Sequence, residues 1–340
     1  MGYIVPTPLL NNVYAESLRQ ALMDDCSIEM LSVAKGRVFA NADVHTMVVV
    51  LRRECDENAR ASHQLLATSG LDERANDGRL EYSTTAQSRY AQTRGHVWNI
   101  LLTEENASVL ERLAATGCAL GDVATMNRGL ITGARGEFFS SERRDERDVP
   151  IIGGADVHRY YTKEPTEYVR FERPDSAGGC WLPEVHFAPH KIVMRQIGSA
   201  PTASLVLEPI AVTGNVFTIR CADVQEEKFT LGVLNSRLMA FFWRTMFADF
   251  KTSFPQFTIF SLTQAPLPQW RSADAACAAL VECVEGMLST RKRALVVDSG
   301  HDRTVLEREI TRLEHVIDRL VFELYGFTDS EIALVEGHID

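Results

Sequence analysis

A long stretch rich in apolar and aromatic residues runs from Leu231 to Gln269. Its first part, up to Phe247, carries apolar residues at helical spacing on nearly every face, which is typical of a buried helix. Phe257 and Ile259 then alternate with neighbouring residues as they would in a strand, and prolines end the segment. The pattern predicts a buried helix, a polar elbow and a short strand.

Residues 1–55 follow the order strand, helix, strand, strand. The first strand, GYIV, ends at prolines, and the helix from Tyr14 to Met23 places Leu18 and Leu22 inward. The last two strands, SIEMLSVA and VHTMVVVLRR, are joined by a short polar link. A link of this length favours an antiparallel hairpin.

Three further segments complete the chain. Residues 56–116 start polar and irregular and end in a helical run, which we interpret as a linker with embedded helices. Residues 117–270 combine short strand patterns with glycine turns and are interpreted as one mixed α+β domain. Residues 271–340 carry two apolar stripes, one of them at near-heptad spacing, which predict a C-terminal antiparallel helical hairpin.

The composition is that of a globular protein. The 340 residues, 45% of them apolar, are enough for two or three packed cores. No apolar run approaches the ~20 residues that span a bilayer, so no membrane partner is expected, and the N-terminus lacks a signal-peptide pattern. Seven scattered cysteines favour reduced thiols and a cytoplasmic location.

The net charge of −11 argues at first against a nucleic-acid partner. However, residues 120–270 carry 16 basic against 17 acidic side chains, so the excess acid lies towards the two ends of the chain. Between His186 and Arg220, three basic residues face a single acid, Glu208. The charge pattern therefore permits a nucleic-acid surface in the central domain without demonstrating one.

Other site chemistries find little support. Cys180, His186 and His190 fit no common zinc spacing, and intervening prolines break any helix that would align them, so no metal site is predicted. Serine, histidine and aspartate residues show no nucleophile elbow or triad signature. We therefore predict no catalytic residue in this chain. The mixed-sign segment ERRDERD at 142–148 is interpreted as a solvated loop.

Several motifs resemble the target-recognition domain of TaqI-type adenine-specific DNA methyltransferases, a domain that also occurs in type IIG restriction–methyltransferases. CALGDVATMNRGLITGARGEFF resembles the entry motif of that domain, with Gly129 and Gly133 at turns. VPIIGGADVHRYY, HKIVMRQIG, the LNS-to-PLP segment and the C-terminal IDRLVFELYGFTDSEI resemble further family segments. The resemblance covers most of the chain.

The resemblance implies an α/β remnant of a class I methyltransferase core at residues 1–55, then the linker at 56–116. A target-recognition domain at 117–270 and a helical hairpin at 271–340 follow. Within the remnant, Phe39 matches the aromatic residue that stacks on the flipped adenine in the family, where such stacking is worth ~1–3 kcal/mol. The alternative is that Phe39 is a core aromatic at the mouth of a hairpin.

For the recognition domain, the resemblance implies a set of residues that contact double-stranded DNA. These are Arg128, Thr132, Arg135, Arg159, Lys191, Arg195, Asn215, Lys251 and Gln256. For each basic residue, the alternative is an ordinary solvated surface charge. The group as a whole carries the hypothesis better than any single member.

The sequence lacks an Asn-Pro-Pro-Tyr motif and any glycine-rich loop suited to S-adenosylmethionine. We therefore expect this chain alone to bind no cofactor and to be inactive, whereas the complete enzyme would use S-adenosylmethionine. It would then be the DNA-recognition half of an adenine methyltransferase in a restriction–modification or phage-defence system. A non-enzymatic specificity subunit that directs separate methyltransferase or nuclease chains, and an inactive gene remnant, are the alternatives.

The strand GYIV has a consequence for partners. In a class I methyltransferase this strand lies inside the sheet, next to strands of the catalytic half. Here one side of it should present unpaired backbone groups, which invite pairing with another chain. Residues 1–55 also bury too little surface for a core of their own. We therefore expect docking on a catalytic half or self-association through this strand.

Overall fold

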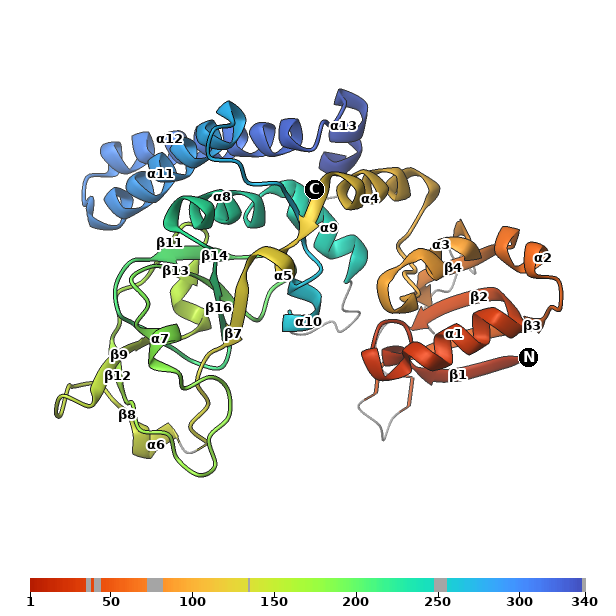
Figure 1. Cartoon of the computed structure of the whole chain (residues 1–340), viewed down its shortest axis with the longest axis horizontal. Helices are drawn as coiled ribbons and strands as arrows, with labels where there is room; N and C mark the ends of the chain where they lie inside the picture. The colour runs from red at the N-terminus through yellow and green to blue at the C-terminus, as the bar shows by residue number, and fades with distance from the viewer. Residues whose placement is uncertain (35–37, 40–43, 72–81, 134, 248–255, 338–340) are drawn as a thin grey trace. The chain divides into compact units, whose positions relative to one another are not determined.

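The computed structural model describes the chain except residues 35–37, 40–43, 72–81, 134, 248–255 and 338–340 (Figure 1). The chain forms two compact units. Unit 1 comprises Met1–Leu110 and Phe242–Pro255, and unit 2 comprises Glu111–Phe241 and Gln256–Asp340. The boundaries between the units fall within α4 (Glu104–Thr116) and α9 (Arg237–Met246).

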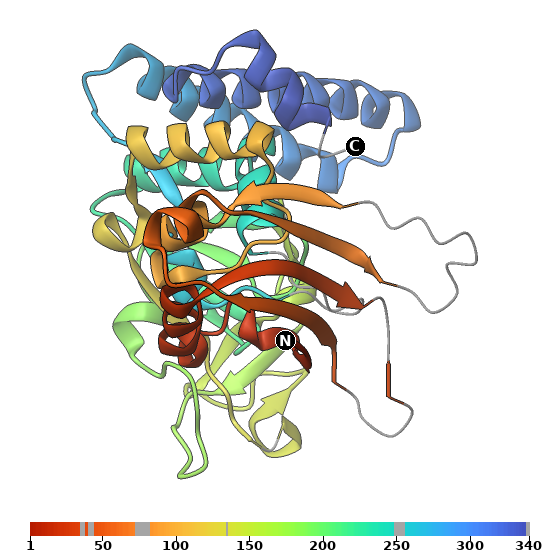
Figure 2. The same ribbon diagram turned by 90° about the vertical axis from the view of Figure 1, so that its right-hand side faces the viewer.

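Unit 1 is built on a sheet in which five strands are described (Figure 2). In spatial order they are β1 (Gly2–Pro6), β3 (Thr46–Arg53), β2 (Cys26–Ala34), β4 (Gln64–Leu71) and β5 (Ser83–Ala86). All neighbours pair antiparallel except β2 and β4, which are parallel. The predicted strand, helix, strand, strand order of residues 1–55 and the antiparallel hairpin are thus present.

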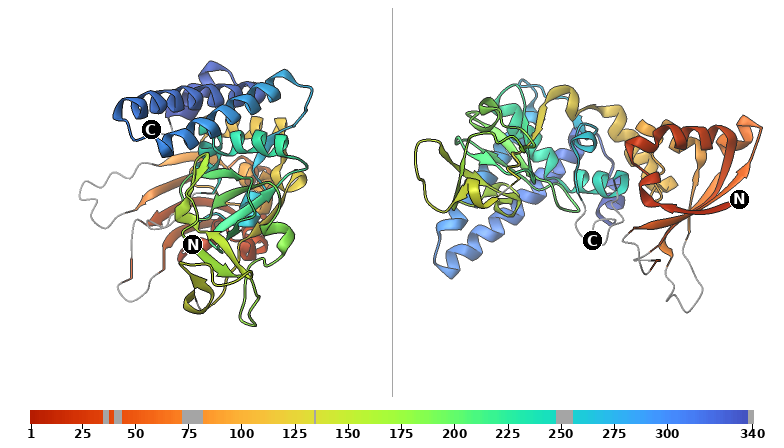
Figure 3. Two further views of the ribbon diagram at one scale, coloured as in Figure 1. Left: turned by 90° about the vertical axis from the view of Figure 1, so that its left-hand side faces the viewer. Right: turned by 90° about the horizontal axis from the view of Figure 1, so that it is seen from below.

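Helices cover one face of this sheet. The alternating residues Ile28, Leu31, Val49 and Leu65 point into a core that includes Trp98. The described helices that lie wholly within unit 1 are α1 (Glu16–Asp25), α2 (Glu57–Ser62) and α3 (Gln87–Gln92), with 3-10 turns at Thr7–Leu9, Val13–Ala15 and Arg94–His96. The right-hand view of Figure 3 shows α1 lying along the sheet.

One side chain of α1 departs from the expected pattern. Leu18, expected to face inward, is 53% exposed, whereas Arg19 is 1% exposed. The Arg19 guanidinium donates hydrogen bonds to the backbone carbonyls of Leu9, Asn12 and His96, with N···O distances of 3.1, 2.9 and 2.8 Å. Burial is tolerated because these carbonyls replace water as hydrogen-bond acceptors. Hydrophobic spacing alone does not detect such a residue.

The interpretation of residues 56–116 as a linker is wrong for the part that forms β4 and β5. Both strands belong to the sheet, and Leu65 and Ala67 of β4 are buried in the core of unit 1. Residues 1–55 are too few to form a core alone, and the buried residues of β4 help to complete that core. The sequence signal is weak because QLLATSGL is short, lacks a regular alternation of apolar and polar residues, and is flanked by polar residues.

Unit 2 contains two four-stranded sheets among its described residues. The first has the order β14 (Ala203–Val206), β13 (Lys191–Arg195), β16 (Val216–Arg220), β7 (Thr125–Arg128), all antiparallel. The second has the order β15 (Ala211–Val212), β9 (Asp148–Ile152), β12 (Glu167–Arg170), β8 (Phe139–Ser140). Two short pairs add β10 (Val157–His158) with β11 (Tyr161–Thr162), and β6 (Gly117–Ala119) with β17 (Pro266–Pro268). Short helices α5 (Leu120–Val123), α6 (Arg135–Phe138) and α7 (Pro183–His186) and a 3-10 turn at Gly154–Asp156 connect them.

The predicted long helix from Leu231 to Phe247 is two helices. α8 (Val224–Leu234) ends at Asn235, and α9 starts at Arg237. The expected strand around Phe257 is also wrong, because Ile259–Leu262 forms a helical turn, α10. Thr258 caps this turn by accepting a hydrogen bond from the Ser261 N–H at 3.0 Å, which an alternating hydrophobic pattern does not reveal.

Two long helices, α11 (Ala275–Val296) and α12 (Gly300–Leu324), lie side by side and are followed by α13 (Asp329–Gly337) (Figure 1). α11 packs on α8 at Gly232, where an added Cβ would come within 2.9 Å of Val284 and 3.0 Å of Leu280. No described helix has the length and apolar character needed to cross a membrane.

Candidate nucleic-acid interface

Three loops of unit 2 meet at one end of the β7–β16–β13 sheet. The loop after β7 pairs with the loop at 178–180, since the N–H of Ile131 donates to the Gly178 carbonyl and that of Gly178 to the Ile131 carbonyl, both at 3.0 Å. It also contacts the turn at 212–215, where the N–H of Leu130 donates to the Val212 carbonyl at 2.9 Å. A polar surface forms where these loops end.

Gly129 and Gly179 allow the backbones of these loops to approach each other closely. A Cβ on Gly129 would collide with the carbonyl oxygens of Val212 and Thr213, and one on Gly179 with the carbonyl oxygen of Gly129. Gly129 is thus required for close backbone approach, while Gly133, with a φ of +78°, provides the left-handed turn. The sequence predicts turns at Gly129 and Gly133. In the structure, Gly129 allows close backbone packing, whereas Gly133 forms the left-handed turn.

Arg128 and Arg195 lie at the same end of this sheet. In the strand register, Arg128 is opposite Phe217, and Arg195 is opposite Val216. The exposed Arg128 donates from Nε to the Gly214 carbonyl at 2.5 Å and from Nη2 to the Gln196 side-chain oxygen at 3.3 Å. These bonds fix the guanidinium on the surface while leaving part of its N–H fork for a ligand.

Arg195 is half-buried, and its Nε has no hydrogen-bond partner among the described residues. It lies near Lys163 and His158. Burial lowers the pKa of His158, and the positive charges of Lys163 and Arg195 lower it further. Around His158, the two cations Lys163 and Arg195 outnumber the one carboxylate, Asp156, so this corner carries a net positive charge.

Asn215 and Gln256 are exposed at this end of unit 2. The side-chain oxygen of Asn215 accepts hydrogen bonds from the Gly154 N–H, at 3.1 Å, and from the Thr213 hydroxyl. Gln256 forms an isolated β-bridge with Ile197. The predicted residues Arg128, Arg195, Asn215 and Gln256 therefore share a surface that carries charge and amide groups.

Two other predicted residues, Lys191 and Thr132, are buried and do not reach this surface. Lys191 is fully buried, and its Nζ donates to the carbonyl oxygens of His186 and Glu208 at 2.7 and 3.4 Å. Burial lowers the pKa of Lys191 to about 8. Thr132 is 7% exposed, so its side chain lies within the protein. This burial gives no support to a DNA contact at Lys191 or Thr132, and both contacts stay predictions.

The side chain of Arg159 binds at the break between α8 and α9. Its Nη2 donates to the Asn235 carbonyl at 2.8 Å, its Nη1 lies 3.4 Å from Glu314, and its guanidinium lies over the Tyr160 ring. These contacts account for its charge within unit 2, so the prediction of a DNA contact is not supported for Arg159. The sequence around Arg159 does not indicate that its side chain is held by contacts within the protein.

Three predicted residues remain, and of these the structure describes the side chain of Phe39 but not those of Lys251 and Arg135. Lys251 lies outside the described residues, and Arg135 is described for its backbone in α6 only. Phe39 is 46% exposed in unit 1. It is therefore accessible to solvent and is not a core aromatic, while its stacking role stays a prediction.

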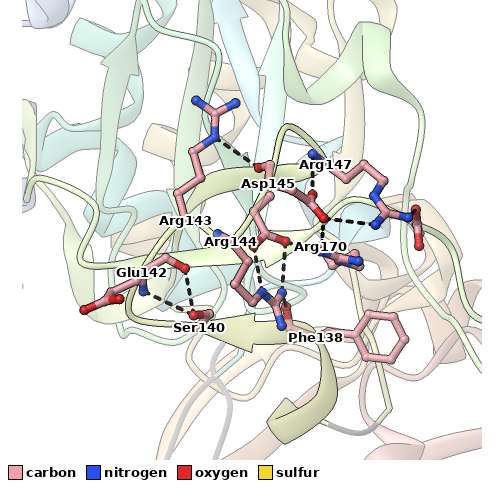
Figure 4. A network of polar contacts seen from close by, with 10 residues as sticks. Phe138, Ser140, Glu142, Arg143, Arg144, Asp145, Arg147 and Arg170 are labelled. Atoms are coloured by element: carbon pink, nitrogen blue, oxygen red, sulfur yellow. Dashed lines mark hydrogen bonds and ion pairs between the residues drawn. The ribbon is translucent and has the colours of Figure 1, made fainter.

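The loop ERRDERD is exposed at residues 142–147, as expected of a solvated loop, but its side chains also form an organised polar network that includes the buried Asp148 (Figure 4). Asp148 is fully buried and accepts hydrogen bonds from Arg144 Nε and Nη2 at 2.7 and 2.9 Å, and from Arg170 Nε at 3.3 Å. Asp145 pairs with Arg147 and Arg170 at 2.9 and 2.6 Å. The Arg144 bonds keep the pKa of Asp148 well below its usual range, and those of Arg147 lower the pKa of Asp145 to about 2.

The cysteine and histidine side chains near this region have structural partners. His186 Nε2 contacts the Cys180 carbonyl at 2.9 Å, and its Nδ1 accepts from the Val212 N–H at 3.3 Å. Among the described residues, no group of three or more histidine, cysteine, aspartate or glutamate side chains is placed to hold a metal ion.

The sequence reasoning missed Asn127, Arg173 and Gln196, which lie at or beside Arg128. Asn127 and Arg173 line a surface groove of about 500 Å³ together with Arg128, and Gln196 is its hydrogen-bond partner. The position of Asn127 directly before Arg128 on β7 was a usable signal, whereas Arg173 arrives from a distant loop.

Residues 149–267 match the family model of the TaqI-like C-terminal specificity domain. The resemblance to a TaqI-type recognition domain is thus confirmed. The matched TaqI-like region contains Arg195, Asn215 and Gln256, and Arg128 lies before it. No curated protein matches the chain.

Among solved structures, the chain is similar to the type IIL restriction–modification enzyme MmeI, solved in complex with DNA. The TM-score is 0.62 at 10% identity, over 99% of this chain and 49% of MmeI. The type IIG restriction endonuclease BpuSI aligns with a TM-score of 0.40 and 12% identity, over 95% of this chain and 47% of BpuSI. The HsdS subunit from Thermoanaerobacter tengcongensis aligns with a TM-score of 0.35 and 13% identity, over 65% of this chain and 51% of HsdS.

At 10% identity, the likeness to MmeI shows a shared fold. The chain spans about half the length of the restriction–modification enzymes that it matches. The architecture of the chain is mixed α/β, and most of the TaqI-like region lies in unit 2, while residues 242–255 of it belong to unit 1.

Proposed function

We propose that this chain reads the sequence of duplex DNA as the specificity part of an adenine-specific DNA methyltransferase in a restriction–modification system. The observation that carries the proposal is the position of Arg128 and Arg195 at one sheet end of a chain with a TaqI-like specificity domain. Both are cations beside exposed amides. Arginine can form two hydrogen bonds with guanine and asparagine or glutamine two with adenine, so this surface suits base recognition as well as phosphate contact.

Comparison with the solved restriction–modification enzymes supports the DNA assignment. MmeI, whose fold this chain shares, was solved with DNA bound. The overall charge of −11 does not oppose this function, because DNA binding depends on the local field at the contact surface. At the sheet end, that field comes from Arg128, Arg195 and Lys163.

The test is the affinity of the chain for duplex DNA at several salt concentrations. Arg128→Ala and Arg195→Ala should each weaken binding by about tenfold, because a hydrogen bond to a charged group contributes ~1.5–3 kcal/mol. If the lost contact is to phosphate, the slope of log affinity against log salt should fall by about 0.9. Arg303→Ala, which removes an exposed arginine of α12, is the control and should bind as the wild type. Equal affinity of all four proteins would contradict the proposal.

The catalytic part of the enzyme is proposed to lie outside the 340 residues. The sequence has neither an Asn-Pro-Pro-Tyr motif nor a glycine-rich cofactor loop, so S-adenosylmethionine is expected to bind elsewhere in the complete enzyme. Calorimetric titration of the chain with S-adenosylmethionine should give no heat of binding. Micromolar affinity would show that this part of the proposal is wrong.

The edge strand β1 is the proposed contact of unit 1 with the catalytic part. Among the described strands it pairs only with β3, and its residues Tyr3 and Ile4 are 51% and 57% exposed. The strand has no charged side chain to prevent pairing with another strand. The five-stranded sheet of unit 1 also favours this arrangement over a pure specificity subunit, which has no need of a second core.

Hydrogen exchange tests the β1 contact. Amides of residues 2–5 that face away from β3 should exchange quickly in the isolated chain and slow down when the protein encoded directly upstream is added. A change from fast to slow on self-association at high concentration would favour a homodimer instead. Slow exchange in a monomer at any concentration would rule out the open edge.

A further inference from the structure

A surface groove in unit 2 lies beside strand β7. It has a volume of about 500 Å³, and Asn127, Arg128, Arg173, Gly179, Leu182 and Ile259 are among the residues that line it. We name it the β7 groove. A volume in the range of roughly 300–1,000 Å³ is typical of sites that hold a small molecule or one unit of a polymer.

The side chains that line the β7 groove carry positive charge only. Two of its lining residues, Arg128 and Arg173, are arginines, and none of the lining residues is acidic. The chain as a whole has a net charge of −11. Arg173 is exposed and makes no ion pair within the part of the chain that the structure describes, so its guanidinium is available. The preferred ligand of the groove is therefore an anion.

The groove also offers apolar contact and a hydrogen-bonding amide. Leu182 is 52% exposed and Ile259 is 36% exposed, which is a high exposure for side chains in a concave site. Asn127 projects an amide that both donates and accepts hydrogen bonds. A ligand that matches all three features has an anionic group, a flat apolar body and a polar edge. A nucleotide has this combination.

We propose that the β7 groove holds one nucleotide unit of the bound DNA. Arg128 and Arg173 contact its phosphates, Leu182 and Ile259 pack against the sugar or base, and Asn127 bonds to the base edge. Arg128 is fixed for this task by the Gly214 carbonyl and Gln196. The inference rests on the proposed DNA-recognition function and assigns to it Arg173, Asn127 and Leu182.

The experiment compares full-length variants in duplex binding, with thermal melting to confirm folding. Arg173→Ala should weaken duplex affinity about tenfold and reduce the salt slope by about 0.9, because one phosphate contact is lost. Asn127→Ala should reduce the preference for one base pair of the selected sequence about tenfold and leave the salt slope unchanged. Arg303→Ala, an exposed arginine outside the groove, is the matched control and should behave as the wild type.

The outcomes separate this inference from the proposed function. If the wild type binds duplex DNA and Arg173→Ala and Asn127→Ala bind identically to it, the groove assignment is wrong while the proposed function stands. If the wild type does not bind duplex DNA, the proposed function itself is wrong. A mononucleotide, dAMP, provides the last comparison. Binding of dAMP that Asn127→Ala and Arg173→Ala abolish, with duplex affinity unchanged, would make the groove a free-nucleotide site and overturn the DNA assignment.

Discussion

Asn235 forms two 3.0 Å hydrogen bonds with the backbone of Ala203. The side-chain oxygen accepts from the Ala203 N–H, and the side-chain amide donates to the Ala203 carbonyl. Asn235 is also the residue at which α8 ends, and its own carbonyl accepts from Arg159. The break between α8 and α9 is therefore held by strand β14, which a hydrophobic pattern cannot indicate.

Asn235→Ala should reduce the free energy of unfolding by about 1–3 kcal/mol, because the buried Ala203 N–H loses its acceptor. The Ala203 carbonyl loses one of two donors and keeps the Tyr160 N–H at 2.9 Å. Chemical denaturation followed by circular dichroism measures the change. Gln225→Ala, on the exposed side of α8, is the control and should stay within about 0.5 kcal/mol of the wild type. An equally small effect of Asn235→Ala would show that these bonds contribute little.

Gly129→Ala should disrupt the loops at the candidate interface. The added methyl group meets the carbonyl oxygens of Val212 and Thr213, which belong to the backbone and cannot rotate away. We expect a loss of more than about 2 kcal/mol in stability and a loss of duplex binding, measured by melting and DNA titration. At Gly136 an added Cβ meets nothing within 4 Å, so Gly136→Ala should leave both quantities unchanged. Normal binding by Gly129→Ala would contradict the packing argument.

Lys191→Met separates a structural lysine from a DNA contact. Because Nζ is buried on two carbonyls, the variant should bind duplex DNA within about twofold of the wild type. The pKa of Lys191 is lowered to about 8 in the folded state, against ~10.4 when unfolded, so folding releases its proton between these values. The wild type should thus gain stability relative to Lys191→Met, by about 2–3 kcal/mol, as pH rises from 8 to 10.4. A pH-independent difference would refute the lowered pKa.

Asp148→Asn tests the arginine network. Removing the carboxylate that Arg144 and Arg170 share should cost about 1–3 kcal/mol at pH 7. The pKa of Asp148 is lowered in the folded state, so its stabilisation is complete above the unfolded value of ~3.9 and is lost as pH falls towards the lower folded value. Urea denaturation at pH 7 and pH 3 should show a smaller gap between wild type and variant at pH 3. Glu142→Gln, at an exposed neighbour, is the control, and a gap that grows in acid would contradict the assignment.

The sequence predicts individual strands and helices well, but it predicts their tertiary contacts poorly. The strands β2 and β3 are predictable because each is a short, mostly buried apolar run with polar residues on both sides. β4 and β5 are missed because their pairing partners lie far away in sequence, and α10 because its capping residues also fit a strand. The spacing of hydrophobic residues indicates which face of a strand or helix is buried. It does not indicate which other strand or helix packs against that face.

The candidate site shows the same limit. Lys191 and Arg195 are both cations on β13, yet only Arg195 reaches the surface at the sheet end. Lys191 lies where His186 and Glu208 provide carbonyl acceptors for its charge. Arg159 is likewise drawn to Glu314 and Asn235. Sequence identifies the residue types that suit DNA, and only the fold decides which of them are free for it.

The central claim is that this chain recognises a specific DNA sequence, and selection from a library of randomised duplexes tests it most directly. The wild-type chain should enrich one short sequence, and Arg128→Ala and Arg195→Ala should lose or relax preference at individual base pairs, each worth about 1–3 kcal/mol. Arg303→Ala should select the same sequence as the wild type. Retention of the library without any enriched sequence, or no retention at low salt, would contradict the account.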